Sequence, residues 1–331
     1  MENEKIDFVI IWVDGNDPEW QKEKAKYSPN KNADSRNIRY RDWDNLRYWF
    51  RGVEKFAPWV NNIYFVTCGH VPEWLNVNHP KLQIINHRDY IPEEYLPTFS
   101  SHPIEINLHR IKGLSEKFVY FNDDMFVIDN VRKEDFFKDG LPVDVGLESA
   151  VTTQENSMLK IYYNNLAIVN SNFNKREVLK ERKRWFSLKY GKDVLRGILS
   201  MPWKRFIGFY NCHCPQPFLK ETFNSVWKKN EEVLNITSSN RFRCQEDVSQ
   251  YLFRYWQLCE NKFVPRNTKF SKSITIIDDE KFACKTIQEQ KVKVLCLNDN
   301  ENINNEKIEI FKRNIINSFE KILPEKSLFE K

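Results

Sequence analysis

Two adjacent carboxylates at the end of a short apolar run offer the clearest chemistry in this sequence. Residues 118–121 predict a buried strand, which stops at Asn122, Asp123 and Asp124. Acidic groups just past the carboxyl end of a strand in an α/β fold can hold a divalent cation against phosphates. Because successive side chains of a strand point to opposite sides, we expect Asn122 and Asp124 to share one side, with Asp123 on the other. Asp124 is then the first choice for metal contact, and Asp123 is a second ligand or an orienting group.

Further polar clusters lie at the ends of predicted elements. Glu105 and His109 are four residues apart in a predicted helix, and Asn107 and Arg110 are three apart, so each pair can share a face. Taken singly, such clusters have ordinary explanations as turns, helix caps or surface ion pairs. Together they suggest a functional site. The clusters are Asp14, Gly15, Asn16 and Asp17; Glu105 to Arg110; His213; and Arg243, Glu246 and Asp247.

Strands and helices alternate in a way that would bring these clusters to one edge of a sheet. Apolar runs predict strands over residues 6–13, 63–67, 82–86 and 292–297, besides the strand that precedes Asn122. Helical spacing predicts helices over residues 42–56, with Asp42 as N-cap, over 104–112, after Pro103, and over about 306–323. This alternation predicts an α/β fold with a mainly parallel sheet covered by helices.

The composition is that of a globular protein. A chain of 331 residues with 41% hydrophobic residues, ten Trp and 24 Phe can form one large or two ordinary domains. The net charge of +5 is too small to predict nucleic-acid binding, and it is compatible with anionic substrates or an anionic membrane surface. Residues 1–5 are charged and precede about eight apolar residues, too few for a secretory signal or a membrane span. We expect a cytoplasmic protein whose membrane association would be peripheral, on the inner face.

The cysteines predict reduced thiols rather than a disulfide framework, because there are seven of them without regular spacing. One alternative is a zinc site in which Cys212, His213 and Cys214 are completed by Cys244 and Cys259. That spacing matches no common zinc module, since adjacent ligands cannot easily face one ion.

A basic segment occupies residues 174–192, where eight Lys and Arg side chains surround apolar and aromatic residues. Its ordinary interpretation is the solvated face of a helix. The functional alternative is a basic arm for an anionic acceptor or a membrane surface.

The segments that carry the polar clusters resemble the conserved motifs of the Stealth family of sugar-1-phosphate transferases, found in bacterial capsule synthesis and in the animal enzyme that tags lysosomal glycoproteins. Residues 6–17 resemble the first motif, 209–218 around His213 the third, and 243–247 with the following aromatic helix the fourth. The resemblance to the second motif is longest: it comprises residues 47–60, 63–67, 96–101, 104–105, 108–111 and 113–118, and runs into Asn122, Asp123 and Asp124.

The resemblance extends over about residues 6–260 and implies a GT-A-like, Rossmann-like fold. It implies a single catalytic domain over residues 1–331, with a helical insertion or acceptor-facing subdomain at 150–205, where no motif matches. A strand and a helix within 270–331 would complete the domain. The implied reaction joins a sugar-1-phosphate to an acceptor glycan: an acceptor hydroxyl attacks the β-phosphate of a UDP-sugar, UMP leaves, and the anomeric configuration persists.

The family reaction also implies roles for the clustered residues. Phosphoryl transfer depends on positioning and charge neutralisation, so Mg²⁺ or Mn²⁺ on Asp124, with Asp123 as a second ligand, would bind the diphosphate. Arg243 and Arg110 would stabilise charge on the phosphoryl oxygens. His213 is the candidate base, since imidazole titrates near neutral pH, with Glu105 or Asp124 as alternatives. The expected substrate-binding residues are Asp14, Gly15, Asn16, Asp17, Asn107, His109, Asn122, Glu246 and Asp247.

The expected partners are a UDP-sugar donor and a polysaccharide acceptor, within a peripheral membrane or capsule-assembly complex. The donor stays open among N-acetylglucosamine, N-acetylgalactosamine, galactose and N-acetylmannosamine. One alternative function is a metal-dependent glycosyltransferase on the same fold, which would attack the anomeric carbon and release UDP. A second alternative is a non-catalytic carbohydrate-binding or scaffolding protein, although such a protein needs no base beside a metal site.

Overall fold

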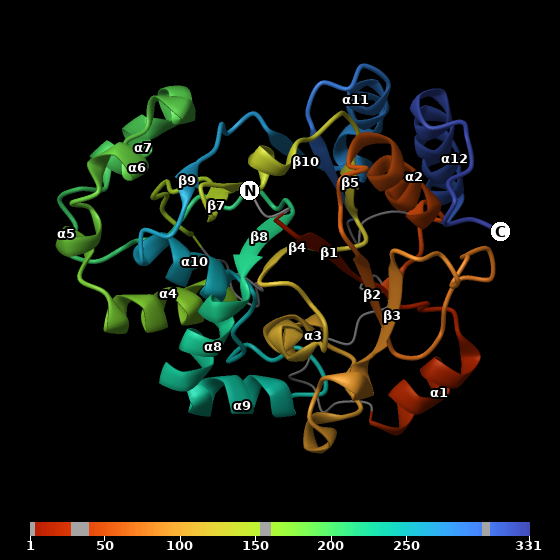
Figure 1. The fold of residues 1–331 in the computed structure, drawn as a ribbon, viewed down its shortest axis with the longest axis horizontal. Coiled ribbons are helices and arrows are strands. Elements are labelled where there is room, and N and C mark those ends of the chain that lie inside the picture. Colours follow the sequence, from red (N-terminus) through yellow and green to blue (C-terminus); the bar gives the residue numbers. More distant parts are fainter. Residues whose placement is uncertain (1–3, 28–39, 153–159, 300–304) are drawn as a thin grey trace.

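The computed structural model describes residues 4–27, 40–152, 160–299 and 305–331 (Figure 1). At its centre is a five-stranded sheet in the order β3-β2-β1-β4-β8. The first four strands in that order run parallel, and β8 is antiparallel to β4. This arrangement confirms the predicted α/β fold with a mainly parallel sheet. The strands are β1 (Ile6–Ile11), β2 (Ile63–Thr67), β3 (Leu82–Asn86), β4 (Lys117–Phe121) and β8 (Gln216–Leu219).

The central sheet is covered on both faces, because consecutive side chains of its strands enter two different cores. Phe8 and Ile10 of β1 belong to one core, whereas Val9 belongs to the other. A sheet that is buried on both sides explains why these strands are apolar almost throughout rather than alternating with polar residues.

The core on the side of Phe8 is closed by α2 (Leu46–Phe56) and by a second, three-stranded sheet. That sheet has β10 (Ser271–Thr275) parallel to β11 (Val294–Asn298), and β5 (Met125–Val127) antiparallel to β11. Helices α11 (Ile276–Gln288) and α12 (Asn305–Ile322) complete the layer, at the upper right of Figure 1. Residues 122–124 therefore connect β4 of the central sheet to β5 of a different sheet.

The core on the side of Val9 is closed mainly by helices. Residues of α3 (Ser101–Ile106), α4 (Lys160–Asn172), α8 (Lys220–Lys229), α9 (Glu231–Ser239) and α10 (Tyr251–Cys259) pack there. Helices α5 (Lys175–Val178), α6 (Arg182–Trp185) and α7 (Val194–Leu199) extend along the left edge of Figure 1, and α1 (Pro18–Lys26) lies at the lower right. A small sheet joins β6 (Phe137–Lys138), β7 (Leu141–Asp144) and β9 (Val264–Pro265). Within the described residues, no helix combines the length and the apolar character that crossing a bilayer requires.

Two helix boundaries differ from those predicted. Helix α2 begins at Leu46, after Asn45, so Asp42 is not its N-cap. The helix predicted over residues 104–112 is α3 (Ser101–Ile106), capped by the hydroxyl of Ser100, which accepts from the backbone of His102, and followed by a 3₁₀ turn at Leu108–Arg110. Ser at an N-cap gives a start signal that precedes Pro103. Residues 105–109 are buried, whereas Arg110 is exposed.

Helix α2 lies directly against the backbone of β5. A Cβ added to Gly52 would lie 2.4 Å from the carbonyl oxygen of Val127, which is closer than real atoms approach. Glycine at this position therefore sets the distance between α2 and the strand that follows the acidic residues 122–124.

Replacing Gly52 with Ala should destabilise the protein by about 1–3 kcal/mol, because overpacking against an immobile backbone outweighs the better helix propensity of Ala. Urea denaturation measures this change. Gly197→Ala in α7 is the matched control, since its added Cβ would meet Leu147 at an ordinary 3.4 Å; it should be neutral or stabilising by up to ~1 kcal/mol. A Gly52→Ala protein as stable as the parent would show that α2 can shift away from β5.

Candidate active site

A cavity of about 390 Å³ opens where the carboxyl ends of β1, β4 and β11 meet. This is the edge at which ligands of open parallel sheets bind. Its lining comprises residues 11–13, Trp20, 40–43, 45–46, His87, 98–101, Ile104, 122–124, His213, Arg243 and 297–299. The structure thus brings together five residues predicted from the sequence to act in a site: Asn122, Asp123, Asp124, His213 and Arg243.

The acidic residues form a turn between two sheets. The backbone N–H of Met125 donates to the carbonyl of Asn122 at 3.2 Å, and the N–H of Leu297 in β11 donates to the carbonyl of Asp124 at 2.9 Å. Asn122, Asp123 and Asp124 all line the same cavity. Strand β4 ends at Phe121, so strand alternation does not fix the directions of these side chains, and the placement of Asp123 on the opposite side stays a prediction.

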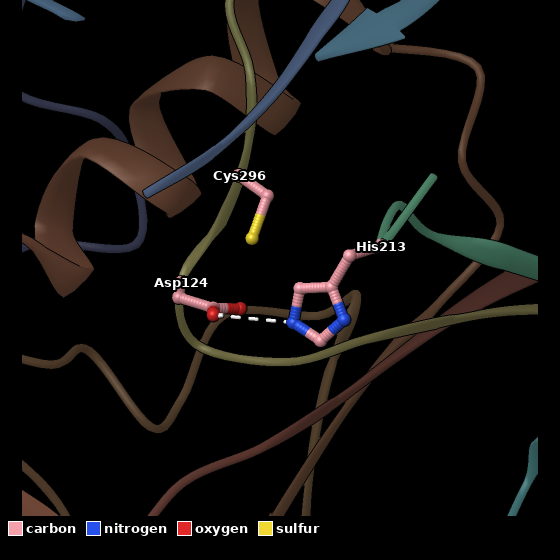
Figure 2. Close-up of side chains that lie close together, drawn as sticks. All are labelled: Asp124, His213 and Cys296. Atoms are coloured by element: carbon pink, nitrogen blue, oxygen red, sulfur yellow. Dashed lines mark ion pairs between the residues drawn. The ribbon is translucent and has the colours of Figure 1, made fainter. Parts of the chain in front are cut away.

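Asp124 and His213, which line the cavity, lie together with Cys296, which is buried behind the lining (Figure 2). One ligand atom from each lies within 4.8 Å of the others, and Nε2 of His213 is 3.6 Å from Oδ2 of Asp124. Oδ1 of Asp124 is buried and has no hydrogen-bond partner among the described residues. A buried carboxylate oxygen without a partner is costly unless a cation binds it. The donor set of carboxylate, imidazole and thiol therefore fits a divalent metal.

Negative charge is concentrated around this point. Loss of solvation, followed by repulsion from Asp124 and Asp42, raises the pKa of Asp123 to about 7. Loss of solvation also raises the pKa of Asp42. Residue 123 as a whole is nevertheless exposed, so solvent weakens both the loss of solvation and the repulsion. A divalent cation would favour the charged form of each carboxylate.

The cavity lining holds a fourth carboxylate that is already neutralised. Nη1 of Arg41 donates to both oxygens of Asp299 at 3.0 Å, and Nε1 of Trp43 donates to Oδ2 at 3.2 Å. Arg41, Asp299 and Cys296 were not predicted from the sequence, and Asp42 was predicted only as a helix cap. The position of Asp299 just past the predicted strand over residues 292–297 is the signal that could have found it.

A loop with a strained backbone presents His213, whose φ of 44° lies in the left-handed region. Arg254 of α10 fixes this loop: it donates from Nη1 to Oδ1 of Asn211 at 2.8 Å, and its Nε and Nη2 pair with buried Asp144 at 2.7 and 3.0 Å. The hydroxyl of Tyr251 lies 3.4 Å from Nδ1 of His213. Burial lowers the pKa of His213, but the hydrogen bond and charge of Asp124 outweigh burial and raise this pKa overall.

Arg243 faces the cavity from the loop before α10. Its Nη2 donates to Oγ of Ser101 at 2.9 Å, and within the described residues no ion pair involves its guanidinium. Buried Asp247 shapes this loop by accepting from Nδ1 of His102 at 2.8 Å and from the N–H of Cys244 at 2.9 Å. Asp247 therefore supports the loop from outside the cavity lining. Glu246, predicted to bind substrate, is exposed and does not line the cavity either.

The predicted cluster of residues 14–17 flanks the cavity without lining it. The side chain of Asp14 accepts from the N–H of Asn16 at 2.8 Å, and Asp17 caps α1 by accepting from the N–H of Trp20 at 2.7 Å. Gly15 lies against Tyr40, where an added Cβ would be 2.1 Å from the carbonyl oxygen. These residues hold the loop that places Val13 and Trp20 in the wall.

The predicted cluster of residues 105–110 is also kept apart from the cavity. Glu105 is buried and accepts from the hydroxyl of Tyr120 at 3.2 Å and from the N–H of Gln250 at 3.3 Å. Asn107 accepts from Nε of Arg110 at 2.9 Å, as their spacing predicted.

Arg110 and His109 turn towards α8. The guanidinium of Arg110 lies 4.7 Å from the ring centroid of Trp227, and His109 packs beside Phe223 and Trp227. Burial, with the nearby Arg110 charge, lowers the pKa of His109 to about 3. The structure therefore does not bring Glu105, Asn107, His109 or Arg110 to the cavity.

The zinc alternative is not supported by the described residues. His213 groups with Asp124 and Cys296, and no metal-ligand group there joins it to Cys212, Cys214, Cys244 or Cys259.

Aromatic side chains also line the cavity. They are Trp12, Trp20, Tyr40, Trp43 and Phe99. Flat apolar walls beside charged groups suit a ligand that has a planar ring at one end and anionic groups at the other.

Comparisons with known proteins agree with the motifs. Stealth protein CR1, conserved region 1, matches residues 4–32, and Stealth protein CR2, conserved region 2, matches residues 39–143. These matches confirm the resemblance to the first and second motifs, whereas the third and fourth stay predictions.

Similar proteins extend the match to nearly the whole chain. The capsular polysaccharide phosphotransferase WcwK of Streptococcus pneumoniae is 44% identical, over 99% of this chain and 98% of that protein. The receptor polysaccharide phosphotransferase WefC of Streptococcus gordonii is 40% identical, over 99% of each. Among solved structures, the galactosyltransferase LgtC in complex with donor and acceptor sugar analogues has a TM-score of 0.42 at 11% identity, over 94% of this chain and 95% of that chain.

Replacing Asp124 with Asn should weaken Mn²⁺ binding by roughly a factor of 100, because the substitution removes the charge of a carboxylate whose oxygen has no other partner. Isothermal titration calorimetry on the metal-free protein measures this affinity. Asp139→Asn is the matched control, since Asp139 is exposed and does not line the cavity. Equal affinities for the two variants would remove Asp124 from the metal site.

Proposed function

Because this chain belongs to the Stealth family of polysaccharide phosphotransferases, we propose that it transfers a sugar-1-phosphate from a UDP-sugar to a hydroxyl of an acceptor glycan. The product is a phosphodiester in a capsular or cell-surface polysaccharide, and UMP is released. The observation that carries the proposal is the convergence of Asp124, His213 and Arg243 on one cavity with an aromatic wall. UDP-N-acetylglucosamine is one candidate donor.

The cavity offers a separate surface for each part of the donor. Trp12, Tyr40 and Phe99 supply flat walls that suit the uracil ring. Arg243 suits the diphosphate, since guanidinium groups bind phosphate oxygens in a bidentate manner and this one faces the cavity without an ion pair in the described chain.

The reaction requires that one bond to the β-phosphorus forms as another breaks. The acceptor oxygen bonds to phosphorus, the bridging oxygen leaves with UMP, and the hydroxyl proton moves to a base. His213 is our proposed base. The Asp124 carboxylate, 3.6 Å from Nε2, would stabilise the imidazolium that results. Glu105, the alternative base, accepts hydrogen bonds in the interior and does not line the cavity.

A divalent cation held by Asp124, together with Asp123, would neutralise charge on the diphosphate. Carboxylate oxygens suit Mg²⁺ and Mn²⁺ alike, so either ion fits the two Asp side chains. His213 cannot serve as a base through Nε2 while that atom binds a metal, so the two roles exclude each other.

The acceptor and the setting of the reaction are further proposals. Helices α4 to α7, between the matched motifs, are our candidates for acceptor recognition. Attachment to a membrane or to a capsule-assembly complex stays a prediction.

The nucleotide released distinguishes this proposal from a glycosyltransferase. We expect UMP when the protein is incubated with Mn²⁺, a capsule-type acceptor and one of a panel of UDP-sugars, with UMP and UDP separated by chromatography. The expected UMP signal depends on both donor and acceptor and identifies the donor sugar. Release of UDP would mean attack at the anomeric carbon and would overturn the proposed reaction.

Replacing His213 with Gln should lower kcat by a factor of about 10² to 10⁴, because the acceptor hydroxyl loses its base. Steady-state UMP release gives kcat, and calorimetry gives the Mn²⁺ affinity of the same variant. His79→Gln is the control, since His79 does not line the cavity and contacts Phe329 instead. Loss of Mn²⁺ affinity in parallel with kcat would assign His213 to the metal instead, and near-normal kcat would exclude both roles.

A further inference from the structure

Large apolar side chains are exposed together on residues 188–203. Leu188 is 94% exposed and Leu199 is 72% exposed. We call this set the apolar patch: Leu188, Leu195, Ile198, Leu199, Met201 and Trp203. Single exposed apolar residues are common on protein surfaces, whereas a contiguous group marks a surface that another body covers.

The patch arises because α7 uses only one of its faces to pack. Val194 packs with the cluster of Val145, Leu147 and Tyr190, and Gly197 and Ser200 are buried. Leu195, Ile198 and Leu199 follow the i, i+3, i+4 spacing of the opposite face, so all three point outwards. In Figure 1, α7 lies at the outer edge of the molecule.

A buried ion pair fixes the patch to the body of the protein. Nζ of Lys175 lies 2.7 Å from Oε2 of Glu148 and donates to the carbonyl of Ser200 at 2.7 Å. The hydroxyl of Ser200 also donates to Oε2 of Glu148 at 2.7 Å. Since both charges are buried and satisfied, the outward face of α7 is held in a defined position.

Cations surround the patch. Residues 182–205 contain eight Lys and Arg and one acidic residue, Asp193. Arg184 and Lys189 donate to carbonyls of Phe263 and Pro265, and so brace this edge against the chain near β9. The side chains of Lys183, Lys192, Lys204 and Arg205 are exposed.

The apolar side chains and the cations around them together restrict which kind of partner could cover the apolar patch. A second copy in a two-fold dimer would place the same cations opposite one another, which is unfavourable. A free anionic glycan would neutralise the cations but leave the apolar side chains in water. An anionic bilayer satisfies both, since acyl chains accept the apolar groups and lipid headgroups pair with Lys and Arg.

We propose that residues 188–205 dock the protein on an anionic membrane surface, with the apolar patch inserted at the headgroup boundary. This location differs from the predicted basic arm over residues 174–192: Lys175 is buried within that segment, and most of the patch lies beyond it. The docking surface is separate from the cavity lining and does not depend on the proposed reaction.

Sedimentation with sucrose-loaded vesicles tests the proposal on the intact protein. We expect binding to vesicles of phosphatidylglycerol and phosphatidylcholine in equal parts, and little binding to phosphatidylcholine alone. Raising NaCl from 0.1 to 0.5 M should weaken binding to the anionic vesicles. Leu199→Ser/Trp203→Ser should lower the partition coefficient at least about tenfold. Lys204→Glu/Arg205→Glu should lower it at least about 25-fold, since each cation contributes roughly a fivefold factor.

Matched controls carry the same changes elsewhere on the surface. Ile310→Ser/Leu328→Ser removes two exposed apolar side chains, and Lys26→Glu/Lys228→Glu reverses two exposed cations. Both controls should bind like the parent protein, and all variants should unfold at the parent temperature because the altered side chains are exposed.

Three results would overturn the proposal. The first is a parent protein that does not bind anionic vesicles, and the second is patch variants that bind these vesicles as the parent does. The third is a parent protein that is a dimer in sedimentation velocity and becomes a monomer in the patch variants. The third result would assign the patch to self-association. None of these measurements uses the transferase reaction, so failure here is separable from failure of the proposed function.

Discussion

Crowding of negative charge at the turn over residues 122–124 is the constraint on which this architecture depends. Asp123, Asp124 and Asp42 lie around one cavity, and an oxygen of Asp124 has no partner in the described protein. Such a cluster opposes folding unless a cation completes it. The fold tolerates the cluster because neighbouring elements hold the turn rigidly: β11 bonds its backbone, and α2 presses on the strand that follows it through Gly52.

Buried charged groups also hold the loops that carry the other cavity residues. Buried Asp144 holds Arg254, which holds the loop of His213, and buried Asp247 holds the loop of Arg243. The residues that face the cavity are thus partly accessible, whereas the charged groups that fix their loops are buried and paired. Because buried pairs position the loops, the accessible side chains do not need all of their own hydrogen bonds for positioning. Their remaining donors and acceptors can bind a ligand.

The sequence predicted residues of the cavity where polar side chains directly follow a strand. Apolar runs located β2 and β3 with their observed bounds, and polar residues after strands or in marked turns identified Asp124, His213 and Arg243. Prediction from the sequence failed where the position of a side chain depends on contacts with residues far away in the chain. Asp42 has the residue type of a helix cap, but α2 begins at Leu46, after Asn45. Glu105, Asn107 and His109 are buried among residues that the local spacing does not identify. Cys296 gave no local signal, since only the pairing of β11 with β5 places its thiol beside Asp124.

The change of sheet at the acidic turn has a consequence for the order in which the protein forms during synthesis. β4 can pair with β1 as soon as the first 121 residues exist, but β5 hydrogen-bonds to β11, which is made about 170 residues later. The backbone of Asp124 is held by Leu297, and Cys296, its neighbour in the candidate metal site, lies on the same late strand. A growing chain on the ribosome therefore carries the acidic residues long before it can arrange them, and the candidate metal site is complete only when the last part of the polypeptide has been made.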